Sequence, residues 1–348
     1  MRLVARPEPS LALTLAAPAL ACLAALAVAA VPLAFAGADI AAAYALMAKG
    51  ALGTPFALSE TLTRATPLIF TGLAAAVAFR ARLWNIGAEG QLYLGALAAV
   101  VAGTAFAGPS WTLAPVAMAA GAAAGAAAAA GPAWLKARLG VDEVVVTLLM
   151  NFVILLFVQM MLEGPLKDPM GMGWPQSEPL PDAARLPRLF DRLRVHAGLP
   201  LALALAVLAH LALARTTAGF RVRAVGENPA AARHAGLPVA RTLVAVGVVS
   251  GALAGLAGAG EVAGPKGYVT ADLSPGFGYA GIAVAMLAGL SPLGVVAAAL
   301  FVAAVFVGAD SMSRAIGVST YLADLIVALT LIFVLAGGLL ARFRLARG

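Results

Sequence analysis

RTTAGFRVRAVGENPAAARHAGLPVART, residues 215–242, separates two long apolar stretches of the chain. This arginine segment holds five arginines, at positions 215, 221, 223, 233 and 241, against a single acidic residue, Glu227. An excess of arginine in a loop between membrane helices is typical of the cytoplasmic side. The segment therefore predicts a membrane protein whose chain leaves the bilayer here, on the cytoplasmic side, and then re-enters it.

The arginine segment also contains the signals of a short helix. Asn228 suits the N-cap, and Pro229 suits the first helical position, where its missing N–H costs nothing. Alanines follow, which are strong helix formers. Gly236 then suits the left-handed residue that ends a helix, and Pro238 prevents any continuation. We expect two or three helical turns in water, although residue types alone fit an ordinary cytoplasmic loop equally well.

Composition places the whole chain in the membrane. Hydrophobic residues make up 62% of the 348 residues and charged residues 11%, whereas a soluble domain carries about 25% charged residues. Backbone polar groups in lipid must be paired within each segment, which favours helices. We therefore expect an all-α membrane protein with one transmembrane domain over residues 1–348.

The charged and metal-binding residue types exclude several other classes. The net charge is +7, but the basic residues gather at the ends of apolar stretches rather than along one face, so nucleic-acid binding is not expected. The single cysteine, Cys22, leaves no intramolecular disulfide. His196, His210 and His234 lack metal-ligand spacing, so no metal site is expected.

About ten transmembrane helices, with both chain ends in the cytoplasm, fit the pattern best. The expected spans are 11–36, 61–79, 92–107, 111–135, 141–162, 201–214, 243–262, 279–290, 293–309 and 321–340. This arrangement places 14 of the 23 basic residues at the inner surface. The first apolar run exceeds the length of a signal peptide's apolar region, which favours a retained span over a cleaved signal. A Pro-rich loop at about 163–199 is expected outside, facing a partner.

Two of the expected spans carry glycines at four-residue spacing. Gly121 and Gly125 lie on the fourth span, and Gly247, Gly251 and Gly255 lie on the seventh. Small residues four apart share one helix face and let two helix backbones approach closely. We expect both faces to be helix-packing surfaces.

Polar residues interrupt the apolar pattern at WNIGAEGQ, residues 84–91. One interpretation is a cytoplasmic turn, with Asn85 as an N-cap and Glu89 near a helix N-terminus. The other is a broken helix that lines a translocation path, because irregular backbone at membrane depth must be buried in protein or face water. Thr147 and Asn151, four apart on one helix face, either bond a neighbouring helix or meet substrate.

These motifs together resemble permeases of ABC importers in the branched-chain amino acid, simple sugar and nucleoside group. The pattern RxRAVGENPxAARxAGL, at 221–237, resembles the cytoplasmic coupling loop of that group. NIGAEGQ, at 85–91, looks like the signature of its nucleoside permeases, and DEVVVTLLMNF, at 142–152, is similar to its fifth helix. The resemblance extends from about residue 62 to residue 340.

The resemblance implies specific roles and partners. The short helix would dock on an ABC ATPase subunit, with the coupling residues Arg223, Gly226, Asn228, Pro229, Ala231, Ala232, Arg233 and Gly236. The substrate pathway would include Asn85, Glu89, Gln91, Thr147 and Asn151. Further partners would be a second permease chain, homologous or identical, and an extracytoplasmic substrate-binding protein. Nucleosides or simple sugars would then cross a bacterial inner membrane by alternating access.

ATP chemistry is expected in another subunit. The chain has no Walker A, H-E-x-x-H or G-x-S-x-G motif, so we expect a transport subunit without an ATPase site and without a cofactor of its own. The alternative is a proton-coupled secondary transporter, with Glu89 or Asp324 as the coupling carboxylate. A non-transport scaffold is a third class.

Overall fold

The structure, a computed structural model, describes residues 2–5, 11–106 and 108–346. The chain forms two compact units, Leu62–Ala299 and the combination of Met1–Thr61 with Leu300–Gly348. The helices α3 (Pro55–Arg80) and α12 (Pro292–Ile316) contribute to both units. Nearly all regular structure is helical, as expected from the composition.

The unit that contains both chain ends is built from long apolar helices. It holds α1 (Leu11–Phe35), α2 (Ile40–Leu52), α13 (Thr320–Arg342) and an antiparallel pair of short strands, β1 (Arg2–Ala5) and β2 (Phe343–Ala346). Helices α1 and α13 lie side by side. The core of this unit is formed by its helices and the C-terminal part of α12, through Ala29, Leu33, Ala43, Met312 and Ile326.

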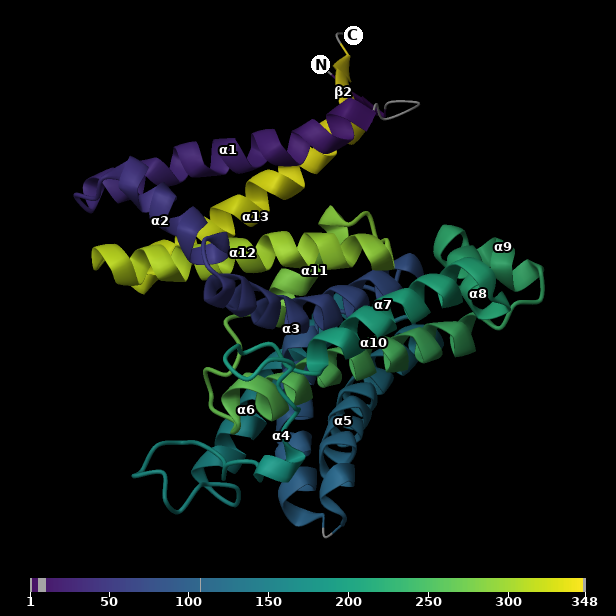
Figure 1. Cartoon of the computed structure of the whole chain (residues 1–348). Helices are drawn as coiled ribbons and strands as arrows, with labels where there is room; N and C mark the ends of the chain where they lie inside the picture. The colour runs from purple at the N-terminus through teal and green to yellow at the C-terminus, as the bar shows by residue number, and fades with distance from the viewer. Residues whose placement is uncertain (1, 6–10, 107, 347–348) are drawn as a thin grey trace. The chain divides into compact units, whose positions relative to one another are not determined.

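The central unit contains the remaining elements. They are α4 (Ala88–Ala105), α5 (Ser110–Leu139), α6 (Glu143–Glu163), the 3-10 turn η1 (Asp182–Ala184), α7 (Gly198–Arg215), α8 (Thr217–Glu227), α9 (Pro229–His234), α10 (Val239–Glu261), the π-helical turn η2 (Val262–Lys266) and α11 (Phe277–Leu287). Helices α4, α5 and α10 pack mutually. Figure 1 shows α8 and α9 beyond the ends of α7 and α10.

Glycine contacts hold α4, α5 and α10 together. A Cβ atom added at Gly255 of α10 would meet the backbone of Gly121 and Gly125 of α5, and one added at Gly95 of α4 would meet the backbone of Gly255. The carbonyl of Gly125 lies where a Cβ atom of Gly251 would be. Both glycine faces predicted from four-residue spacing are therefore confirmed as close helix-packing surfaces.

Six helices in the described residues are long and apolar enough to cross a membrane: α3, α5, α6, α7, α10 continued through η2, and α12. Leu23–Phe35 and Ile40–Leu52 pass the same criterion as a pair bent by 120°, which raises the number to seven. A helix covers most of each of the ten predicted span ranges, but α11 is short and α4 carries polar residues in its first turns. The protein is a multi-pass membrane protein, and the number of ten spans stays a prediction.

Two helices were not predicted as separate elements. Residues 37–60 lie between the first two predicted spans, yet they contain α2, which Asp39 caps by accepting from the Ala42 N–H at 3.1 Å. The arginine segment contains α8 as well as the predicted short helix. The sequence showed no periodic apolar face for α8, because arginines and glycines alternate with its apolar residues.

Candidate functional site

A buried non-helical segment joins α3 to α4. Residues 81–87 leave the helical path after Arg80, and α4 begins at Ala88. Asn85 and Gly87 are buried, as are Glu89 and Gln91 in the first two turns of α4. The helical path is therefore interrupted inside the protein, where each backbone N–H and C=O group that lacks a helical hydrogen bond needs another partner.

Asn85 and Gln91 form a closed pair of amides. Each amide nitrogen donates to the other's oxygen, at 2.9 and 3.0 Å. The Asn85 oxygen also accepts from the Gly87 N–H at 3.0 Å, and its nitrogen also donates to the hydroxyl of Ser250 in α10 at 3.0 Å. The side-chain amide of Asn85 thus has all its donors and acceptors paired within the protein and fixes the segment. Its role in the substrate pathway stays a prediction.

Thr147 and Asn151 of α6 hold the other side of the same segment. The Ile86 N–H donates to the Thr147 hydroxyl at 3.1 Å, and the Gly90 N–H donates to the Asn151 oxygen at 2.8 Å. The Asn151 nitrogen donates to the Ile86 carbonyl at 2.9 Å and to the Tyr279 hydroxyl at 3.3 Å. Tyr279 is 41% exposed, so this bond places the polar end of an accessible aromatic ring beside buried Asn151.

Glu89 joins the N-termini of two helices. It lies in the first turn of α4, and its carboxylate accepts from the Gly278 N–H, in the first turn of α11, at 2.6 Å. The Ser274 side chain is a second hydrogen-bond partner. Helix N-termini carry partial positive charge, so one carboxylate stabilises both ends. A Cβ atom at Gly278 would meet the Glu89 backbone, which shows that the two helix ends touch directly.

All five residues predicted for the substrate pathway are buried around one segment. The N-cap interpretation of Asn85 is wrong: Gly87 is the N-cap of α4, and Asn85 bonds the Gly87 N–H instead. Sequence reasoning missed Ser250, Gly278 and Tyr279, which come from α10 and α11 and carry no motif of their own. Only their proximity to residues 85–151 in the fold identifies them.

The arginine segment folds as two helices with an apolar core of its own. Asn228 caps α9 by accepting from the Ala230 and Ala231 N–H groups at 3.0 Å. The chain then turns at Gly236, which has a φ of +76°, so the predicted cap and stop are both confirmed. Ala232 packs with Val225 and Val239, whereas Ala231 and Arg233 are exposed. The segment is an ordered platform whose outer α9 face is accessible.

Backbone contact links the arginine segment to the largely buried residues 81–91, which are called the polar segment below. A Cβ atom at Gly226, near the end of α8, would meet the Arg80 carbonyl and Ala81. Arg80 ends α3, immediately before the non-helical residues 81–87, and its guanidinium donates to the Leu290 carbonyl at 3.2 Å. Glu143 of α6 ties the same non-helical residues to α5 and α6, because it accepts from the Trp84 N–H at 3.3 Å and pairs with Lys136 of α5 at 2.6 Å. Movement of α8 would therefore press directly on this junction.

The Pro-rich loop between α6 and α7 is folded onto the region after α10. Ser177 N–H donates to the Val269 carbonyl at 3.0 Å, Leu180 N–H to Gly267 at 2.7 Å, and Leu186 N–H to Ala263 at 2.7 Å. The loop is thus a structured surface, and its role as a face toward a partner stays a prediction.

His196, near the end of this loop, should make the stability of the loop depend on pH. Burial lowers the pKa of His196 to about 4 from 6.5, and its ring packs against Gly264. Between these two pH values the unfolded loop therefore binds a proton on His196, while the folded loop does not. The stability of the folded loop should be constant above pH 6.5 and fall by about 3 kcal/mol as the pH drops to 4. After correction for the slower intrinsic exchange of amides at low pH, the hydrogen–deuterium exchange protection of residues 189–197 should decrease over this range. The His196→Gln variant should show a flatter pH profile, and an equally steep profile would assign the response to another group.

Comparisons with known proteins agree on one family. The sequence model of one protein family, the permease component of the branched-chain amino acid transport system, matches residues 57–335. A glucose ABC transporter permease of Haloferax volcanii is 38% identical over 94% of this chain and 88% of its own length. A guanosine ABC transporter permease of Bacillus subtilis is 37% identical over 86% of each chain, and a nucleoside ABC transporter permease of Lactococcus lactis is 32% identical over 76% of this chain and 75% of its own. No solved structure matches this chain.

Proposed function

Because this chain belongs to the permease-component family of the branched-chain amino acid transport system, we propose that it moves nucleosides or simple sugars by alternating access. The chain is the membrane-spanning permease subunit of an ABC transporter, as its relatives are. The relatives' names cover glucose, guanosine and nucleosides. Neither the family nor the relatives support a proton-coupled secondary transporter.

The coupling element in this proposal is α9. The observation that carries it is an exposed short helix, capped at Asn228 and anchored by Ala232, whose neighbour α8 touches the Arg80 carbonyl through Gly226. A partner that docks on Arg233, Ala231 and the helix start at Pro229 would transmit its own movement to α9 and, through it, to α8. Arg223, Gly226 and Gly236 then act by shaping and orienting the platform.

The translocation path runs beside the polar segment in this proposal. Asn85, Thr147 and Gln91 hold the broken backbone in shape. The exposed Tyr279 ring, with its hydroxyl bonded to Asn151, offers a flat apolar surface beside a polar group. Ligand sites combine such aromatic surfaces with a few fixed polar groups, and a nucleoside or sugar ring presents matching chemistry.

The full transporter in this proposal contains further chains. ATP is bound by an ABC ATPase subunit that docks on α9, and this chain holds no cofactor. A second permease chain, homologous or identical, completes the membrane part, and a substrate-binding protein docks on the loop at 164–197. The arginine segment lies in the cytoplasm of a bacterial cell, since basic loops favour that side of the inner membrane.

The docking role of α9 can be tested by placing a charge on its exposed face. Ala231→Glu should reduce co-purification of the ATPase subunit by tens of fold, because losing a packed interface contact costs about 2 kcal/mol or more. The matched control is Ala183→Glu, the same change at an exposed alanine of the external loop. Its ATPase co-purification should equal that of the unmodified protein. Normal assembly and ATP-driven uptake by Ala231→Glu would show that α9 is not the coupling element.

A further inference from the structure

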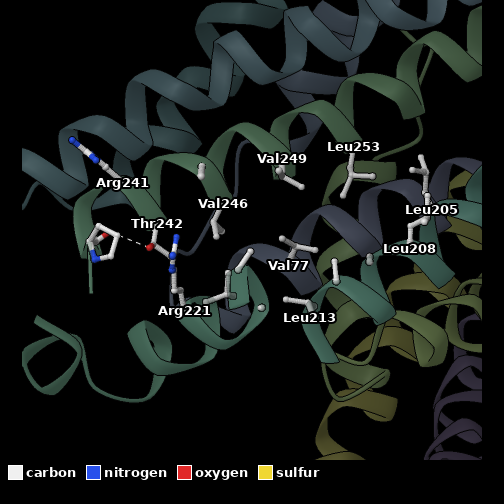
Figure 2. Close-up of a pocket in the computed structure, with 17 residues that line it drawn as sticks. Val77, Leu205, Leu208, Leu213, Arg221, Arg241, Thr242, Val246, Val249 and Leu253 are labelled. Atoms are coloured by element: carbon white, nitrogen blue, oxygen red, sulfur yellow. Dashed lines mark hydrogen bonds between the residues drawn. The ribbon is translucent and has the colours of Figure 1, made fainter. Parts of the chain in front are cut away.

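A cavity of about 540 Å³ lies among α7, α8 and α10, away from the polar segment. Its walls are apolar side chains, notably Val246, Val249 and Leu253 of α10, Leu205 and Leu208 of α7, and Val77 of α3. Figure 2 shows these side chains facing one another along the two helices. Such a lining does not suit a nucleoside or a sugar, so the cavity is not part of the proposed substrate path.

One end of this cavity is strongly basic. Arg221 and Arg241 line that end, together with Thr242, whose hydroxyl already donates to the Pro238 carbonyl at 3.0 Å. In Figure 2 the guanidinium of Arg221 lies at the cavity, whereas the Arg241 side chain extends outward from the same end, so Arg221 is the nearer of the two charges. Figure 2 shows Arg221 beside Thr242, with the apolar side chains continuing away toward Leu253. Within the described residues, neither arginine forms an ion pair. The first turns of α8 and α10 lie at the same end, and their N-termini add partial positive charge.

The cavity's length matches one leaflet of a bilayer. Its lining on α10 extends from Arg241 to Leu253, which at 1.5 Å per residue spans about 18 Å. The hydrocarbon layer of one leaflet is about 15 Å thick. A cavity of about 540 Å³ that runs the length of one leaflet between apolar side chains has room for an extended acyl chain.

We propose that this cavity binds one phospholipid with an anionic headgroup. An acyl chain lies among the apolar side chains of α7 and α10, and the phosphate lies at the Arg221 and Arg241 end. Guanidinium groups form charge-assisted hydrogen bonds to phosphate, and basic pockets at the ends of membrane helices bind anionic lipid headgroups. Because α8 forms one wall, a bound lipid would hold the arginine segment against α7 and α10.

Native mass spectrometry of the full chain, with added phosphatidylglycerol or phosphatidylethanolamine, tests the headgroup. The unmodified protein should bind one phosphatidylglycerol about thirtyfold more tightly than it binds phosphatidylethanolamine. This preference equals about 2 kcal/mol of binding free energy, shared by the two arginines. The double variant Arg221→Gln/Arg241→Gln should bind both lipids equally. The control Arg192→Gln/Arg215→Gln loses the same charge at exposed arginines outside the cavity and should keep the preference. Equal binding of both lipids by the unmodified protein, or an unchanged preference in the cavity variant, overturns the proposal.

A second pair of variants tests the apolar part. Val249→Trp should fill the cavity and reduce binding of both lipids at least tenfold. Val207→Trp, at a valine of similar exposure on α7 (48% against 47%) that does not line the cavity, should bind them normally. The same measurement on the assembled transporter decides between a lipid and a protein occupant. Retention of the phosphatidylglycerol supports the lipid, whereas its loss on assembly, with cross-linking of Val249→Cys to a partner chain, overturns the proposal.

Discussion

Gly255→Val is expected to remove most of the folded protein, whereas Gly131→Val should leave the folded fraction close to normal. A Cβ atom at Gly255 would overlap the carbonyl of Gly121 and lie 3.1 Å from the Cα atom of Gly125, both in α5. Backbone atoms cannot rotate away, so α10 and α5 must separate. At Gly131, also within a helix, the added Cβ would meet nothing within 4 Å beyond its chain neighbours and the adjacent backbone of its own helix.

The expected cost at Gly255 exceeds an ordinary overpacking penalty of about 1–3 kcal/mol. Gly95 of α4 also packs on the Gly255 backbone, so the helix shift would open the α4 contact as well. The measurement is the folded fraction in detergent, followed by size-exclusion chromatography during heating. Both variants replace a helical glycine by the same β-branched residue. Gly131 also precedes Pro132, so any extra local helix cost falls on the control and would narrow the difference rather than create it. Equal thermal stability of the two variants would mean that α10 and α5 do not touch through their backbones.

The glycine contacts show which features of this fold could be predicted from the sequence. A four-residue glycine spacing identifies a helix face directly, because both the spacing and the face are local properties of one helix. The α9 cap at Asn228 and its stop at Gly236 were predictable for the same reason. The arginine segment as a whole was recognisable because its polarity contrasts with long apolar neighbours.

Features that depend on distant residues were not predictable in this way. The sequence offered two interpretations of residues 84–91, and only the fold shows that Asn85 is bonded to Ser250, 165 residues away. Gly278 and Tyr279 likewise become important through contacts with α4 and α6. Helix α2 was missed because Asp39 and Lys49 flank a short apolar run that is no longer than many loops. The position of the candidate site could therefore be predicted from local polarity, whereas its hydrogen-bond partners could be identified only from the structure.

Glu89→Gln is expected to abolish most substrate uptake while the transporter assembles normally and keeps its basal ATP hydrolysis. Glutamine retains an oxygen that can accept from the Gly278 N–H, so the α4 and α11 ends should stay in contact. It loses the charge that stabilises both helix N-termini and the stronger charge-assisted bonds. Weakening bonds of this kind costs about 1–3 kcal/mol, which lowers the population of the arrangement that holds Tyr279 beside Asn151 by about 5- to 150-fold.

Uptake into proteoliposomes that contain the whole transporter measures this effect, with and without ATP and with and without a pH gradient. The matched control is Glu163→Gln, the same change at an exposed glutamate at the end of α6, which should transport normally. Uptake by the unmodified protein should require ATP and ignore the pH gradient, because ATP supplies the work. Near-normal uptake by Glu89→Gln would reduce this residue to a helix-end charge worth about 0.3–1 kcal/mol. Uptake driven by the pH gradient without ATP would instead assign Glu89 a proton-coupling role, since a carboxylate buried among membrane helices is the usual group for that chemistry.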